Sequence, residues 1–119
     1  MAELGANLER YRENIQHVLT EYSQRRTSGK RDDELEMQCL FDTVRDHYQL
    51  IYVGWDKKGR RVFGPVMHLD IKNDKIWIQW NGTEDDIAAE LVTIGVAKDD
   101  IVLGFHSPFM RQFTDFAVG

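Results

Sequence analysis

The sequence predicts an α+β protein: an antiparallel β-meander sheet of four to five strands, with an N-terminal amphipathic helix and a second helix packed on it. Residues 66–80 predict a β-hairpin, because apolar and polar side chains alternate on both sides of Asn73-Asp74. Two similar alternating runs, at residues 35–42 and 47–55, precede this hairpin. Residues 6–26 instead repeat apolar side chains every three or four positions, as one face of a helix does.

Composition limits both the architecture and the compartment. A chain of 119 residues that is 42% hydrophobic can bury one core, so we expect a single domain over residues 1–119. The 15 Lys and Arg against 20 Asp and Glu give a net charge of −5, which opposes a general attraction to phosphate backbones. Cys39 is the single cysteine, which excludes an intramolecular disulfide and a Cys-rich zinc site. Because a signal-peptide pattern and a membrane-length apolar run are both lacking, we expect a cytoplasmic protein.

The first helix should run from about Ala6 to Arg26 and should cover the sheet rather than bind a partner. Residues 24–34 are polar throughout and predict a solvated connector. Strands are expected at Leu35–Asp42 and His47–Trp55, with a turn between them. These strands and the following hairpin form a meander most simply, because consecutive antiparallel strands need only short connections.

The third strand should start near Arg60, after a hairpin tip at Asp56–Gly59, and should contain an irregularity at Gly64-Pro65. If Asn73-Asp74 is a two-residue loop, one face of the hairpin is apolar and the other is mostly polar. In this register His68 faces Gln79 and Met67 faces Trp80. The apolar face is Met67, Leu69, Ile71, Ile76, Ile78 and Trp80, and the other is His68, Asp70, Lys72, Trp77 and Gln79.

The C-terminal third predicts a helix, a short strand and one helical turn. Thr83 is the expected cap of a helix over Glu84–Ile94 that ends at Gly95. A buried strand should follow at Ile101–Phe105, and Ser107-Pro108 should cap a helical turn. The aromatic tail that follows is expected to pack on the body or on another subunit.

Candidate catalytic residues are few. His68 and Asp70 lie two apart on one strand, so they share a face and suit a metal pair or an acid/base pair. Glu84 would add a carboxylate if its helix returned over that face, and His106 follows a strand end. Hydrogen bonding at a surface and helix capping account for the same residues, and we favour that reading. We therefore expect no cofactor and no bound metal, and a non-enzymatic protein.

Two surfaces suggest macromolecular partners. A basic cluster at the hairpin tip is a weak candidate for nucleic-acid contact, because a charged tip also keeps a hairpin soluble. A set of aromatic and Arg side chains is a candidate partner interface, with a second core layer as the equal alternative. The basic tip is Lys57, Lys58, Arg60 and Arg61, with Arg25-Arg26 and Lys30-Arg31 as a second basic cluster; the interface set is Trp77, Phe109, Arg111, Phe113 and Phe116.

Seven segments carry a resemblance to a known family: Arg45–Leu50, Val53–Trp55, His68–Lys72, Lys75–Gln79, Gly82–Glu84, Asp100–Leu103 and Arg111–Ala117. With these segments, the sequence from Tyr11 onward resembles the XisI family, the fdxN element excision controlling factors of cyanobacteria. The resemblance implies a small α+β protein that helps control programmed excision of a DNA element, beside a site-specific recombinase and a companion protein, XisH. It implies no catalytic residues, so an accessory protein that binds an XisH-like partner and perhaps itself is the leading hypothesis. A small metal- or acid/base-dependent enzyme acting on nucleic acid through His68, Asp70 and Glu84 is the alternative.

Overall fold

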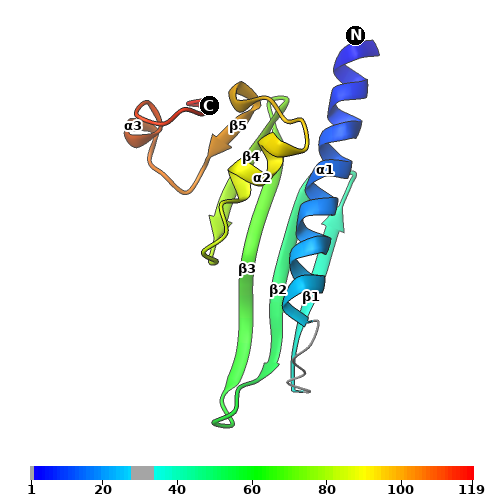
Figure 1. The fold of residues 1–119 in the computed structure, drawn as a ribbon, viewed down its shortest axis with the longest axis vertical. Helices are drawn as coiled ribbons and strands as arrows, with labels where there is room; N and C mark the ends of the chain where they lie inside the picture. The colour runs from blue at the N-terminus through cyan, green and yellow to red at the C-terminus, as the bar shows by residue number, and fades with distance from the viewer. Residues whose placement is uncertain (1, 28–33) are drawn as a thin grey trace.

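The structure, a computed structural model, describes residues 2–27 and 34–119. One five-stranded sheet in the order β1-β2-β3-β4-β5 carries helices on it and at its end (Figure 1). Because the described ranges stop at residue 27 and resume at 34, most of the expected polar connector, including Lys30 and Arg31, lies outside them. The elements are α1 (Ala2–Thr27), β1 (Leu35–Asp42), β2 (His47–Trp55), β3 (Arg61–Lys72), β4 (Lys75–Asn81), α2 (Ile87–Thr93), the 3₁₀ turn η1 (Lys98–Asp100), β5 (Ile101–Leu103) and α3 (Pro108–Arg111).

The predicted α+β fold and the four-stranded meander are confirmed. Strands β1 to β4 pair antiparallel in chain order. The fifth strand, β5, pairs parallel with β4, so the sheet is mixed and mostly antiparallel. Strand β5 can run parallel to β4 because the segment with α2 first carries the chain back along the sheet, as a parallel connection requires.

The core lies between one face of the sheet and the two longer helices. The apolar stripe of α1 packs on β1, β2, β3 and α2, which confirms its predicted role as a cover for the sheet. Figure 1 shows α1 lying along the strands, with α2 over the β4 end. Within the described chain, no helix is long and apolar enough to cross a membrane. The largest fully buried side chains include Ile15 and Leu19 of α1, Tyr48, Leu50, Met67, Leu69, Ile76 and Ile78 of the sheet, and Leu91 of α2.

The β3–β4 hairpin keeps the predicted register only from its turn to Leu69, which pairs with Ile78. A bulge between His68 and Leu69 then shifts the pairing, so that His68 faces Trp80 and Met67 faces Asn81. The predicted His68–Gln79 and Met67–Trp80 pairs are therefore wrong. Cross-strand partners share a face, so the bulge turns Trp80 away from the core and leaves it 51% exposed.

The expected irregularity at Gly64-Pro65 is confirmed. Leu50 pairs with Met67 but Ile51 pairs with Pro65, so Val66 is the extra residue of a bulge between β2 and β3. The carbonyl of Val66 accepts a hydrogen bond of 2.8 Å from the amide of Gly82, just beyond β4. Both bulges of the sheet therefore lie near the place where β4 ends.

The second helix begins later than predicted. Its cap is Asp86, whose carboxylate accepts the amide of Ala89 at 3.0 Å, and not Thr83. The hydroxyl and amide of Thr83 instead donate to the side chain of Asn81, which holds the loop before the helix. The predicted end at Gly95 is confirmed, where φ is +110°, a backbone conformation that glycine adopts readily.

The C-terminal segment folds back on the sheet beyond β5. The predicted strand is shorter than expected and ends at Leu103, whereas the cap of α3 by Ser107 is confirmed. Ala117 then forms a parallel bridge with Val102, and its amide donates to the carbonyl of Ile101 at 2.8 Å. The tail thus packs on the body of its own chain.

Candidate functional site

The face of the sheet opposite α1 carries a connected set of polar side chains, and we call it the second face. Cross-strand pairing of His47 with Asp70 and of Gln49 with His68 brings four of these residues side by side on β2 and β3. His47 Nδ1 lies 2.7 Å and His68 Nε2 lies 2.8 Å from the same oxygen, Oδ1 of Asp70. Gln79 of β4 donates to the other carboxylate oxygen at 3.2 Å, and Gln49 lies 3.2 Å from His68 Nδ1. Asp70 is therefore the centre of this polar cluster.

The electrostatics of the cluster favour a charged carboxylate. Burial raises the pKa of the Asp70 carboxyl, but hydrogen bonds from His47 and Gln79, and the charge and hydrogen bond of His68, outweigh it and hold the pKa below its ordinary value. The hydrogen bond to Asp70 in turn raises the pKa of His47 above its ordinary value. Asp70 is only 16% exposed at its side chain, whereas His47 is 56% exposed, so the cluster opens to solvent on the His47 side.

The structure assembles only part of the catalytic set considered from sequence. His68 and Asp70 do converge, but Glu84 does not join them. In the part of the chain that the structure describes, the one group of three or more His, Cys, Asp or Glu side chains close enough to share an ion is His47, His68 and Asp70. His106 also lies outside this group, and its ring packs on Phe105 with centroids 4.5 Å apart. The predicted His68/Asp70/Glu84 site is therefore not formed.

His47 is the functional candidate that the sequence pattern missed. It is the first residue of β2, and its position opposite Asp70 depends on the register between β2 and β3. The signal available was the hairpin tip after Trp55, because an antiparallel return there places the start of β2 beside the end of β3. Counting along β3 alone, as a single strand, could not reveal this cross-strand partner.

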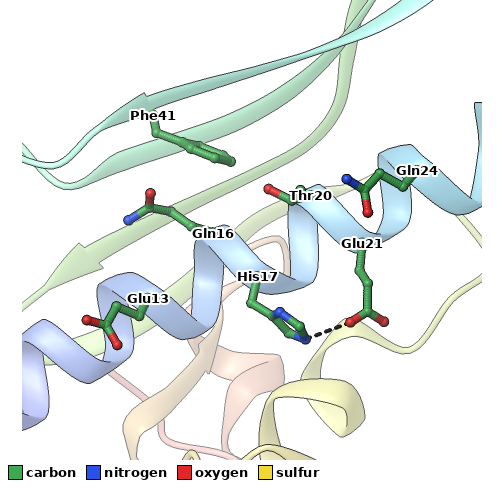
Figure 2. A pocket seen from close by; sticks show the side chains of 7 residues that line it. All are labelled: Glu13, Gln16, His17, Thr20, Glu21, Gln24 and Phe41. Carbon is green, nitrogen blue, oxygen red and sulfur yellow. Dashed lines mark ion pairs between the residues drawn. The ribbon is translucent and has the colours of Figure 1, made fainter.

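Two depressions lie near α1 and β1, one on each side of the sheet. The one beside the polar cluster has a volume of about 410 Å³ and includes His47, Gln49, His68 and Leu40 in its lining. The other, of about 470 Å³, is lined by six residues of α1 and by Phe41 (Figure 2). In this depression His17 Nε2 lies 2.6 Å from Glu21 Oε2, so the two side chains are already paired with each other, and both are about half exposed. Only the first depression adjoins a polar cluster that is partly buried.

The five residues expected at a partner interface fall into two groups. The ring of Trp77 is 7% exposed, because Lys72 lies over it at 4.3 Å from the ring centroid and Arg111 at 5.0 Å. Phe116 is partly buried against the core. Trp77 and Phe116 therefore belong to a second packed layer, which was the alternative to a partner interface. Phe109 and Phe113 remain 66% and 68% exposed and pack edge to face at 5.3 Å. The cover that Trp77 was expected to need comes from its own chain.

The basic hairpin tip is organised by one carboxylate. Asp56 accepts the backbone amides of Lys58 and Arg60 and also the guanidinium of Arg60 at 2.9 Å. Arg61 lies over the ring of Trp55 at 5.4 Å. Two of the four basic side chains proposed for nucleic-acid contact are therefore engaged within the tip.

The comparisons with known proteins agree over nearly the whole chain. The XisI protein family matches residues 6–118. The chain is similar to the crystal structure of a XisI-like protein from Anabaena variabilis ATCC 29413, with 42% identity, 94% of this chain and 99% of that chain covered, and a TM-score of 0.85. It is also similar to the fdxN element excision controlling factor XisI from the same organism, with 35% identity, coverage of 95% and 99%, and a TM-score of 0.81. A search of curated proteins found no match. The protein belongs to the XisI family.

Proposed function

We propose that this protein is a controlling factor for excision of a DNA element of the fdxN type, and that it acts by binding a partner protein of the XisH kind. The role as a controlling factor is supported by the relative named fdxN element excision controlling factor XisI, which is 35% identical to this chain. The mode of action is supported by the second face of the sheet. One face of the sheet holds the packed core, while the other carries several exposed apolar side chains.

The single observation that carries this proposal is the set of exposed apolar side chains on the second face. Leu40 pairs with Gln49, Phe63 with Val53 and Trp80 with His68, so all three lie on the second face. They are 47%, 71% and 51% exposed. Exposed apolar side chains on one face are typical of a protein interface, and aromatic ones bury a large area with few rotatable bonds. Phe109 and Phe113, in and just after α3, are two further exposed aromatic side chains, and Arg111 between them lies over the ring of Trp77.

The experiment is co-expression with a XisH-like protein, followed by size-exclusion chromatography with light scattering. The variants are Phe63→Asp and Phe113→Asp, which introduce a charge at an exposed aromatic position without removing a core side chain. Val44→Asp is the matched control, because Val44 is 85% exposed and lies in the β1–β2 turn. We expect a heterocomplex with the wild type and the control, and at least tenfold weaker binding with one or both variants, because a charge buried at an interface is costly.

Circular dichroism must show that each variant keeps the wild-type fold. Absence of a complex with the wild-type protein would contradict the proposal, as would undiminished binding of both folded variants. Trp77→Asp would not serve, because its buried ring supports the C-terminal segment and its loss would unfold part of the chain.

A further inference from the structure

We propose that His47, His68 and Asp70 form a binding site for one divalent transition-metal ion on the second face. The three ligand atoms, one from each side chain, all lie within 4.8 Å of one another. This inference concerns the chain by itself, so it does not depend on the proposed partner.

The spacing of the three atoms is close to that of a metal-ligand set. Ligand atoms at about 2.0–2.2 Å from a zinc ion in a tetrahedral site are about 3.3–3.6 Å from one another. His47 Nδ1 and His68 Nε2 lie 2.7 Å and 2.8 Å from Asp70 Oδ1, which are hydrogen-bond distances. A widening of these two distances by about 0.5–0.9 Å would let one ion replace the protons that these groups share. His47 can make this movement easily, because its side chain is 56% exposed.

The donor types select the class of metal. Two imidazoles and one carboxylate suit Zn²⁺, Fe²⁺, Ni²⁺ or Co²⁺, whereas Mg²⁺ and Ca²⁺ require oxygen ligands throughout. Cys39 adds no thiolate, because its sulfur lies 3.8 Å from the hydroxyl of Ser23 on α1, on the opposite face of the sheet. The site therefore resembles the open three-ligand sites of zinc and non-haem iron proteins rather than a closed structural zinc site.

An outer set of hydrogen bonds already supports the three residues. Gln79 donates to Asp70 Oδ2 and so orients the carboxylate. Gly104 makes room for Gln79, because a Cβ at that position would collide with the Gln79 amide oxygen. Gln49 Nε2 lies 3.2 Å from His68 Nδ1, and a half-turn of the side-chain amide would place its oxygen there instead. With the oxygen facing the ring, His68 carries its proton on Nδ1 and Nε2 has a free lone pair for a metal.

Three protein ligands leave at least one coordination position free. That position faces solvent, because the depression of about 410 Å³ that includes His47 and His68 in its lining opens on this side. Water or a side chain from another molecule would complete the coordination.

The test is a titration of untagged, chelator-treated protein with Zn²⁺ by isothermal calorimetry, together with the visible spectrum of added Co²⁺. We expect one ion per chain, binding at least tenfold weaker in His47→Gln and in Asp70→Asn, and affinity unchanged in His17→Gln. His17 is the matched control, because it is a surface histidine on α1 that pairs with Glu21, away from the second face. Gln49→Leu should weaken binding by about 10–100-fold, as loss of an outer hydrogen bond to a ligand does.

Circular dichroism checks the folding of each variant, and His47→Gln keeps the test decisive because that side chain is largely exposed. The proposal is overturned if the wild type shows no saturable uptake of either ion. It is also overturned if His47→Gln binds Zn²⁺ as tightly as His17→Gln. Because the titration uses the chain alone, its result is separate from that of the co-expression experiment.

Discussion

Asp46 connects the first helix to the β1–β2 turn. Its carboxylate accepts Arg12 Nε at 2.8 Å and Arg12 Nη2 at 3.2 Å, and the Tyr48 hydroxyl donates to it at 2.9 Å. Asp46 also has a φ of +61°, which Asp and Asn tolerate better than other non-glycine residues. Burial raises the pKa of its carboxyl, but the hydrogen bonds from Arg12 and Tyr48 outweigh this effect, and the pKa lies below its ordinary value.

We expect Asp46→Asn to lower the free energy of unfolding by about 1.5–3 kcal/mol at pH 7, the usual size for loss of a hydrogen-bonded charge. Asn keeps the shape and tolerates the turn, so the loss is mainly electrostatic. Because the folded pKa is depressed, this stabilisation is complete above the unfolded pKa of about 4 and is lost as the pH falls through the folded pKa. Urea unfolding at pH 7 and pH 3 measures it, and the two proteins should differ less at pH 3.

An equal difference at both pH values would contradict this assignment of the effect to the carboxylate charge. Arg45→Ala is the control for a general loss of charge near the turn. Arg45 pairs with Asp42 at 3.3 Å, but its side chain is 75% exposed, and such surface pairs contribute little. That variant should unfold at nearly the wild-type urea concentration.

At the scale of elements, the ring of Trp77 helps to hold the C-terminal segment on the sheet, beside the backbone bridge between Ala117 and Val102. The ring of Trp77 is covered by Lys72 and Arg111, and its Nε1 donates to the carbonyl of Lys72 at 3.1 Å. Arg111 Nε in turn donates to the carbonyl of His106 at 3.0 Å, so the same side chain orders the loop before α3. Removal of the ring would therefore leave a cavity and would also loosen α3.

We expect Trp77→Ala to cost about 3–5 kcal/mol of stability, in line with other buried aromatic truncations. Trp80→Ala is a matched control three residues away in the same strand, because its ring is 51% exposed and outside the core. Thermal unfolding measures the stability, and limited trypsin digestion at Arg111 measures the loosening of α3. Similar melting temperatures and digestion rates for the two variants would show that Trp77 does not hold this segment.

The hairpins illustrate which elements are predictable from sequence. Asn73 and Asp74 both have positive φ, as a two-residue loop that follows the twist of the strands requires, so the turn and the first four pairs follow from local sequence. The bulge at Gln79 and Trp80 contains no Gly or Pro that would mark it in the sequence. The hydrogen bond beside it, from the amide of Gly82 to the carbonyl of Val66, joins residues 16 positions apart, so local sequence does not reveal it. The predicted position of Trp80 in the core was wrong for that reason.

At the scale of the whole molecule, the two faces of the sheet differ in how far the sequence specifies them. On the face that the helices cover, apolar residues recur at every second position of each strand, because burial selects them there. The sequence pattern therefore predicted this face. The polar cluster on the second face depends instead on the alignment of three strands, with bulges in both pairings. His68 and Asp70 were predictable from a single strand, whereas His47 required the register of β2 against β3.

The distribution of charge over the molecule also bears on direct DNA contact. The β2–β3 tip lies at the end of the sheet far from the N-terminus (Figure 1), and its basic residues are one local exception to a net charge of −5. Arg60 pairs with Asp56 and Arg61 packs on Trp55. Tight non-specific binding draws on about 6–10 phosphate contacts, which is more than this tip can supply.

We therefore expect the protein alone to bind a random-sequence duplex more weakly than about 10 µM at 150 mM salt, as proteins with few phosphate contacts do. Fluorescence anisotropy of a labelled duplex measures this affinity, and the double variant Lys58→Glu, Arg60→Glu should leave it unchanged. Wild-type binding that is tight, that weakens steeply with added salt and that disappears in the double variant would contradict this expectation. Such a result would make the hairpin tip a DNA-binding element, because only a local cluster of cations could overcome the repulsion from an acidic chain.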